Sequence, residues 1–250
     1  MPVAAAFELP LDLTWLQLVV VLAITTIGVL VQGTIGFGFG LLAAPVLVAI
    51  DPVFVPGPIL AVACLLTLLV SRRELADIEF ADIGPVFIGR LPGTVVGAAT
   101  MVVLPLKGLV IMVGALVLFA VAMSVSGLRV ERTRRTLVAA GVMSGFMSTV
   151  SSVGGPPLAI AYQRATGAHL RGTLSAHFVL GSAMSLAALF LAGRFGSAEL
   201  IGALLLLPAT VAGYLLSHRT IGVLDESWTR PAILGLSALA GAAIILRELL

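Results

Sequence analysis

Long stretches without charged residues dominate the hydropathy pattern of this chain. The first runs from Leu13 to Ile50, about twice the ~20 apolar residues that cross the hydrocarbon core of a bilayer. Four glycines lie in its middle, between positions 33 and 40, and glycine both weakens a helix and permits positive φ angles. We therefore expect two helical pieces, each too short to cross comfortably, on either side of a break at membrane depth.

A second long uncharged stretch, from Thr136 to Gln163, repeats this arrangement. The residues from Ser148 to Pro157 lie at its middle and are only Ser, Thr, Val, Gly and Pro, which predicts a second break. Because exposed peptide groups are not tolerated in lipid, each break has to be buried in protein or line a water-filled cavity. Further transmembrane helices are expected at 53–70, 83–104, 106–127, 173–193, 199–217 and 231–248.

The two broken stretches belong to an internal repeat. One ungapped shift of 116 residues places Gly38 on Gly154, and it also places Pro92, Thr94, Val95 and Gly97 on Pro208, Thr210, Val211 and Gly213. We expect a first transmembrane repeat at 1–128, a basic cytoplasmic linker at 129–136 and a second transmembrane repeat at 137–250. Each half then holds one broken or re-entrant segment and three transmembrane helices. Transporters are commonly built this way, with the substrate bound between the broken elements.

The basic residues indicate how the two halves are related. If both broken segments enter and leave the membrane on one side, the second half is inverted and the N-terminus lies outside. Ten arginines then lie in the cytoplasm, and three basic residues lie outside: Lys107, Arg194 and Arg247. If each broken segment crosses once, the best distribution is eight against five, with the N-terminus inside. The positive-inside rule therefore favours the inverted repeat.

Composition defines the class of protein. The chain of 250 residues is 60% hydrophobic and only 10% charged, whereas soluble domains have about 25% charged residues. We expect an all-α polytopic membrane protein whose partner is the lipid bilayer. Arginines in short cytoplasmic loops explain the net charge of +2, so no nucleic acid partner is expected. The single cysteine, Cys64, excludes an intramolecular disulfide.

The polar groups at membrane depth suit an anion. All twelve Asp and Glu residues lie in leads, loops or helix junctions, which argues against a carboxylate-based cation site. Arg90 lies about two helical turns inside its span. It is either an attractor for a small anion or an arginine that extends to the cytoplasmic edge. His177 is either a core histidine or, because imidazole titrates near neutral pH, the carrier of a proton coupled to anion movement.

The two breaks are the best candidates for a binding site. A helix that restarts at a break presents free N–H groups and the positive end of its dipole, which together bind anions. Small-residue packing between helices is the alternative explanation. The expected substrate-binding residues, in addition to Arg90, are Gln32, Gly33, Thr34, Gly36, Gly38, Gly40, Ser148, Thr149, Ser151, Ser152, Gly154, Gly155 and Pro156.

Enzymatic and cofactor chemistry find no support in the sequence. His169, His177, His218 and Cys64 lack the spacing of metal ligands, so we expect neither a metal nor a cofactor. The Gly-x-Gly-x-Gly stretch lacks the Lys-Ser/Thr ending of a P-loop. No acidic residue lies at depth to complete a Ser/His/Asp set, and we do not expect an enzyme.

Each half carries one glycine-proline motif. The motifs are Gly28-x4-Gly33-x2-Gly36-Phe-Gly38-Phe-Gly40-x4-Pro45 and Gly145-x8-Gly154-Gly155-Pro156-Pro157, with Arg171-Gly-Thr173 after the second. In this paired arrangement, over almost the whole chain, the sequence resembles the TauE/SafE sulfite exporter family. The resemblance implies a multi-pass secondary transporter in the cytoplasmic membrane for small sulfur-containing anions such as sulfite or organosulfonates, in general an exporter. A passive anion channel and a non-transporting accessory protein are the alternatives, and a homo-oligomer is compatible with the sequence.

Overall fold

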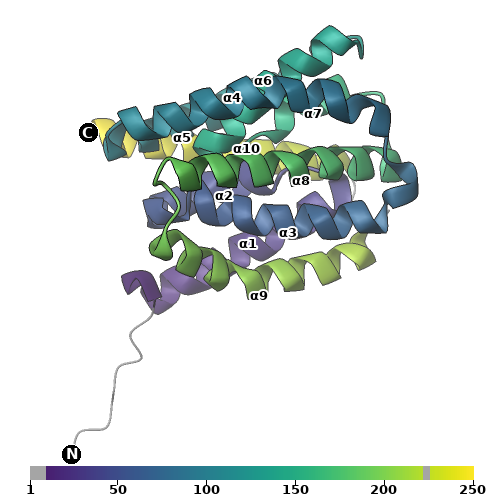
Figure 1. Ribbon diagram of the computed structural model, residues 1–250. Helices are drawn as coiled ribbons and strands as arrows, with labels where there is room; N and C mark the ends of the chain where they lie inside the picture. Colours follow the sequence, from purple (N-terminus) through teal and green to yellow (C-terminus); the bar gives the residue numbers. More distant parts are fainter. Residues whose placement is uncertain (1–9, 222–225) are drawn as a thin grey trace, which may run out of the picture.

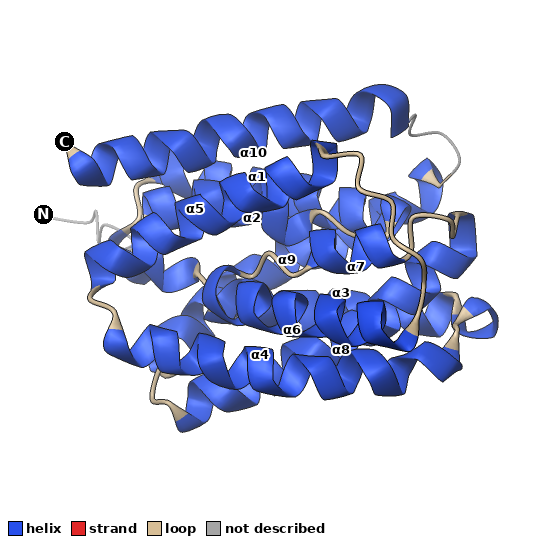
Figure 2. Cartoon of the chain, turned by 90° about the horizontal axis from the view of Figure 1, so that it is seen from above, coloured by secondary structure: helices blue, strands red, loops and turns tan. Residues whose placement is uncertain are grey.

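The computed structural model describes residues 10–221 and 226–250, and within these residues the chain is helical without strands (Figures 1 and 2). Seven of the described helices are long and apolar enough to cross a membrane, which confirms an all-α multi-pass membrane protein. They are α1 (Trp15–Ile35), α3 (Gly57–Arg73), α4 (Ile83–Val103), α5 (Leu106–Val125), α8 (Gly167–Leu191), α9 (Ser197–Thr220) and α10 (Glu226–Leu249). The other α-helices are α2 (Phe39–Ile50), α6 (Arg134–Ser151) and α7 (Gly155–Ala161).

The first uncharged stretch forms one long helix and one short helix, so the expectation of two short pieces was wrong. α1 has 21 residues and is long enough to cross a membrane, whereas α2 has only 12. The difference arises at Gly33, which stays helical. Its missing side chain makes room for α9, since a Cβ here would lie 2.6 Å from Ser217 Oγ. Gly33 therefore serves helix packing, and α1 continues to the break at Gly36.

The second uncharged stretch breaks where the sequence predicts. Thr133 starts α6 with a capping box, in which its side chain accepts the Thr136 N–H. α6 ends at Ser151, and the short α7 follows with Pro156 and Pro157 in its first turn. Proline is tolerated there because the first N–H groups of a helix have no partner within the helix.

The helices pack in pairs that join the two halves of the chain (Figure 1). α4 packs along α6, α1 along α9, α3 along α8, and α5 along α10. If α1 to α5 exchange places with α6 to α10, in order, the pair α4–α6 becomes α9–α1 and the pair α1–α9 becomes α6–α4. The pairs α3–α8 and α5–α10 remain the same pairs. The packing is therefore compatible with a twofold relation between the halves, as an inverted repeat predicts.

Glycines at matching positions permit two of these close approaches. A Cβ at Gly97 of α4 would lie 2.9 Å from the Thr149 Cβ on α6, and one at Gly213 of α9 would lie 2.6 Å from the Thr26 carbonyl on α1. The two glycines are partners in the shift of 116 residues. Both positions thus bring helix backbones together where larger residues would separate them.

Basic residues concentrate at one end of the helix bundle, which we call the basic end. The turns from α3 to α4, from α5 to α6, from α7 to α8 and from α9 to α10 lie there. Arg73 Nη2 donates to the Gly33 carbonyl at 2.6 Å, which joins the end of α3 to the end of α1. Arg230 Nη2 donates to the Ser124 carbonyl at 3.0 Å, which joins the start of α10 to the end of α5. Ten arginines lie at this end. The opposite end holds Lys107, Arg194 and Arg247, which is the distribution that the inverted arrangement predicts.

Large apolar side chains cover much of the outer surface. Val103, Phe190, Leu191 and Leu239 are each at least 68% exposed. In water, a surface of this kind marks an interaction site. Around a bundle of membrane-spanning helices, it is the surface that faces lipid.

Candidate functional site

The two broken segments turn through matching backbone positions. α1 ends at Gly36, whose φ of 108° lies in the left-handed region, and α2 starts after Gly38, with a φ of 121°. α6 ends at Ser152, which is also left-handed with a φ of 61°, and α7 starts after Gly154. The shift of 116 residues that aligns the halves places Gly36 on Ser152 and Gly38 on Gly154. The end of one helix and the start of the next therefore correspond in the two breaks.

The two breaks touch inside the bundle. Gly40, in the first turn of α2, lies against the backbone carbonyl of Ser152, and a Cβ at position 40 would overlap that oxygen. Gln32 fastens the first break, because its Oε1 accepts the Phe39 N–H at 3.1 Å. Ser152 Oγ fastens the second by donating to the Pro56 carbonyl at 3.0 Å. Each break is thus held by a side chain, as buried backbone at membrane depth requires.

A cavity of about 30 Å³ lies between the breaks. This volume is roughly that of one water molecule in the liquid, so the site is narrow in this conformation. Predicted binding residues from both halves line it: Gln32, Gly38, Gly40, Ser148, Ser152, Gly154, Gly155 and Pro156. The structure therefore brings the two breaks together around one small space.

A larger cavity, of about 510 Å³, leads from the basic end to this space, and we call it the vestibule. Phe37, Gly38, Leu41 and Pro156 line both cavities, so these residues form the boundary between them. The exposed Arg129 and Arg230 also line the vestibule. Their positive charges raise the local concentration of anions at its mouth.

Arg90 is the most buried charge near the breaks. It is 1% exposed and lies in α4 against Gly181 of α8. Its Nη1 donates to Ser144 Oγ at 3.2 Å, and Ser144 Oγ donates to the Gly154 carbonyl at 2.6 Å, which links the guanidinium to the second break. Its Nε and Nη2 have no hydrogen-bond partner among the described residues. Burying a cation without a partner costs free energy, and an anion bound nearby reduces that cost.

His177 belongs to a chain of polar groups that runs toward the basic end. Its Nε2 lies 2.9 Å from the hydroxyl of Tyr162, which donates to Asp82 Oδ2 at 3.0 Å. Arg132 Nη1 lies 3.4 Å from the same Asp82 oxygen. Burial, and after it the Asp82 carboxylate, raise the pKa of Tyr162, so its hydroxyl keeps its proton. The histidine is thus neither isolated nor on the cavity wall.

Three predicted binding hydroxyls serve helix packing and do not line the cavity. Thr34 bonds within α1 and lies 2.8 Å from the Thr220 hydroxyl at the end of α9. Thr149 bonds within α6 and lies 2.8 Å from Ser185 Oγ on α8. Ser151 donates to the carbonyl four residues before it. For these positions, the alternative explanation of small-residue packing fits better.

Two serines outside the predicted set belong to the site. Ser182 of α8 lines the cavity, and Ser144 of α6 joins Arg90 to the second break. Ser144 could have been predicted from the sequence, because it lies four residues before Ser148 and thus on the same face of α6. Ser182 could not have been predicted from the sequence, since a single hydroxyl in an apolar span is commonplace.

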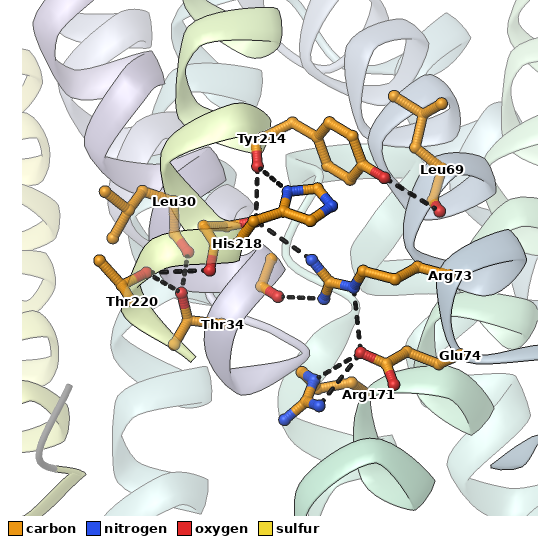
Figure 3. Close-up of polar contacts among 11 residues, drawn as sticks. Leu30, Thr34, Leu69, Arg73, Glu74, Arg171, Tyr214, His218 and Thr220 are labelled. Atoms are coloured by element: carbon orange, nitrogen blue, oxygen red, sulfur yellow. Dashed lines mark hydrogen bonds and ion pairs between the residues drawn. The ribbon is translucent and has the colours of Figure 1, made fainter. Parts of the chain in front are cut away.

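A cluster of ion pairs lies beside the first break at the basic end (Figure 3). Glu74 Oε1, just after α3, lies 3.0 Å from Arg73 Nε and 3.0 Å from Arg171 Nη2. Arg73 also donates to the Gly33 carbonyl of α1. Gly36, another predicted binding residue, lies against the backbone of Arg171 and outside the cavity. The cluster therefore ties the ends of α1 and α3 to the start of α8.

Two broken helices that meet around polar groups, inside a bundle of long apolar helices, define a class of membrane transporters. Within that class, a family model described as Sulfite exporter TauE/SafE matches residues 20–244, and the chain belongs to this family. The resemblance seen in the glycine-proline motifs is thereby confirmed. No curated protein and no solved structure matches the chain. Membership of a transporter family is consistent with a chain that is not an enzyme.

Proposed function

We propose that this protein is a secondary transporter that moves small sulfur-containing anions, such as sulfite or organosulfonates, across the cytoplasmic membrane in the direction of export. The observation that carries the proposal is Arg90, a buried cation with two unpartnered nitrogens, linked through Ser144 to the second break. Gradient-driven carriers of this class bind their substrate between broken helices near mid-membrane. The link from Arg90 through Ser144 to the Gly154 carbonyl supports a site of this kind here.

The anion binds in the cavity between the breaks. Gln32 accepts the Phe39 N–H, but the next residues of the first turn of α2, Gly40 and Leu41, line the cavity with N–H groups that have no partner within the helix and with its positive dipole end. Ser148, Ser152 and Ser182 add hydroxyls. A sulfonate or sulfite group has three oxygens that accept hydrogen bonds from such donors. Arg90 lies behind Ser144 and lowers the energy of negative charge in the cavity. These groups recognise a small oxyanion by charge and hydrogen bonding.

Transport requires the cavity to widen. At about 30 Å³ it does not admit a sulfur oxyanion, and Phe37 and Leu41 separate it from the vestibule. By the positive-inside rule, the basic end faces the cytoplasm. An anion thus enters the vestibule from the cytoplasm past Arg129 and Arg230, and reaches the site when the boundary residues move apart. The narrow cavity favours such a carrier over a passive channel with an open pore.

The experiment is transport of labelled sulfite into proteoliposomes of the purified protein, with sulfoacetate and sulfate as competitors. We expect saturable exchange and gradient-driven accumulation in the wild-type protein. Flux that no gradient drives uphill would support the channel, and the absence of flux for any anion would support an accessory role.

Two variants connect the flux to the site. Arg90→Gln removes the buried cation, and Ser182→Ala removes a cavity hydroxyl with less risk to folding. We expect both to lower exchange, while Arg135→Gln, a charge change at an exposed position, leaves it unaltered. Exchange at the wild-type rate in both folded site variants would contradict the proposed site.

A further inference from the structure

We infer that the anion is carried together with a proton, which His177 binds and which Tyr162 and Asp82 conduct between His177 and the basic end. The inference rests on the proposed function. It concerns the coupling ion and the route that this ion takes. Because anion and proton move in the same direction, the outward gradient of the anion drives export, against any inward proton gradient.

The route is a continuous hydrogen-bonded chain from the interior to the surface. His177 is 2% exposed, and its Nε2 lies 2.9 Å from the Tyr162 hydroxyl. That hydroxyl lies 3.0 Å from Asp82 Oδ2. The Asp82 side chain is 16% exposed, and its neighbour Arg132 is 42% exposed. Each distance is short enough for proton transfer along the bond.

The transfer balances without another reactant. When Asp82 takes a proton from water at the basic end, it becomes the donor to the Tyr162 oxygen, and the Tyr162 hydroxyl turns to donate to an unprotonated His177 Nε2. The Asp82 proton then passes to the Tyr162 oxygen as the Tyr162 hydroxyl proton passes to His177 Nε2. The step leaves Asp82 as a carboxylate, Tyr162 unchanged and His177 as an imidazolium. The reverse sequence returns the proton.

The position of His177 relative to Arg90 couples this proton to the anion. Arg90 lies against Gly181, which is four residues after His177 in α8, so both groups occupy the same face of that helix. A second positive charge beside an unpaired Arg90 is unfavourable. An anion next to Arg90 offsets that charge, and protonation of His177 then becomes more favourable. By linkage, the proton strengthens anion binding to the same extent.

Apart from Arg90 and the thiol of Cys64, the charged or titratable groups near His177 lie at the rim or are already paired. α4 contributes Arg90 and, before its start, Asp82; Tyr162 directly follows α7. α3 contributes Cys64 beside the Val179 carbonyl, and at its end Arg73 and Glu74, which are paired with each other. Arg171, also paired with Glu74, lies at the start of α8. α6 faces this region with Ser144, and its arginines, Arg134 and Arg135, are exposed at its start. Glu79 and Arg132 lie near Tyr162.

The test measures exchange and pH-driven accumulation of labelled sulfoacetate in the same proteoliposomes. Sulfoacetate stays fully ionised around neutral pH, so a response to a pH gradient reports on a proton carried by the protein. With the lumen more alkaline than the medium, we expect the wild-type protein to accumulate the anion. Tyr162→Phe removes only the bridging hydroxyl, and we expect it to lose this accumulation while anion exchange at equal pH continues.

Tyr214→Phe is the matched control, because Tyr214 lies on α9 with its hydroxyl 3.5 Å from the Leu69 carbonyl and outside the chain of polar groups. Asp82→Asn, nearer the surface, is the second variant in case Tyr162→Phe does not fold, and it should also abolish accumulation. Folded variants at positions 162 and 82 that both accumulate like the wild-type protein would overturn the route. Wild-type exchange that ignores the pH gradient would overturn proton coupling alone, whereas no exchange of sulfite or sulfoacetate would overturn the proposed function.

Discussion

Arg90 is the single residue that indicates the candidate site most clearly. Its depth in the sequence predicts either an anion attractor or an arginine that extends to the membrane edge. The structure decides against the edge, because the side chain is 1% exposed and its Nη1 contacts Ser144. Sequence reasoning could not find this, since Ser144 and Gly181 lie on two other helices.

The affinity for an anion should fall when this charge is removed. Arg90 acts on the cavity through its charge, and two unit charges about 6–8 Å apart at an effective dielectric constant of about 20 attract each other by roughly 2–3 kcal/mol, so Arg90→Gln should weaken binding roughly 30- to 100-fold. Arg90→Lys keeps the charge and should lose less. Titration calorimetry of the purified protein with sulfite measures this, and equal affinities in all three proteins would contradict it.

Gly40 makes a residue-scale prediction about stability. Gly40→Ala places a Cβ on the Ser152 carbonyl, and overpacking of this kind costs about 1–3 kcal/mol. Thermal unfolding should show the loss, because the two breaks can no longer touch. Gly84→Ala is the control, since a Cβ there meets nothing within 4 Å. A Gly40→Ala protein as stable as this control would show that the contact is not tight.

At the scale of elements, the sequence predicts most of the helices and both breaks, because apolar length and glycine or serine density are local properties. It misplaces the start of the first break. Gly33 is a packing glycine of α1, and its role depends on Ser217 in a distant helix. Thr34 and Thr149 were predicted to bind substrate because the sequence does not show whether a hydroxyl at membrane depth faces a cavity or another helix.

The ion-pair cluster makes an element-scale prediction. Glu74→Gln leaves Arg73 and Arg171 without their shared carboxylate where α1, α3 and α8 meet. We expect a loss of about 1.5–3 kcal/mol in stability, measured as a lower unfolding temperature. Glu131→Gln, at an exposed position, should change little. If the two variants unfold alike, the cluster does not stabilise this junction.

At the scale of the whole molecule, the helix packing and the charge distribution are both compatible with an inverted repeat. The helix pairs interchange when the halves are exchanged, and ten arginines gather at one end. The sequence predicts this orientation because charge distribution is a property of the whole chain. The sequence does not predict which helices pack together, since apolar helix faces are nearly interchangeable.

Labelling from each side of the membrane tests the orientation. In a Cys64→Ala background, Glu131→Cys should react with an impermeant thiol reagent only from the cytoplasm, and Lys107→Cys only from outside. Labelling of both from one side would contradict the two-ended arrangement.

The central claim is that a sulfur oxyanion binds where the two broken helices meet. Selenite has the shape and charge of sulfite and scatters X-rays anomalously, so a crystal structure of the protein with selenite locates the anion directly. We predict an anomalous peak between the first turn of α2 and Ser182, beside Ser148. Ordered selenite found only outside this cavity, with the Arg90→Gln protein binding it equally well, would contradict the claim.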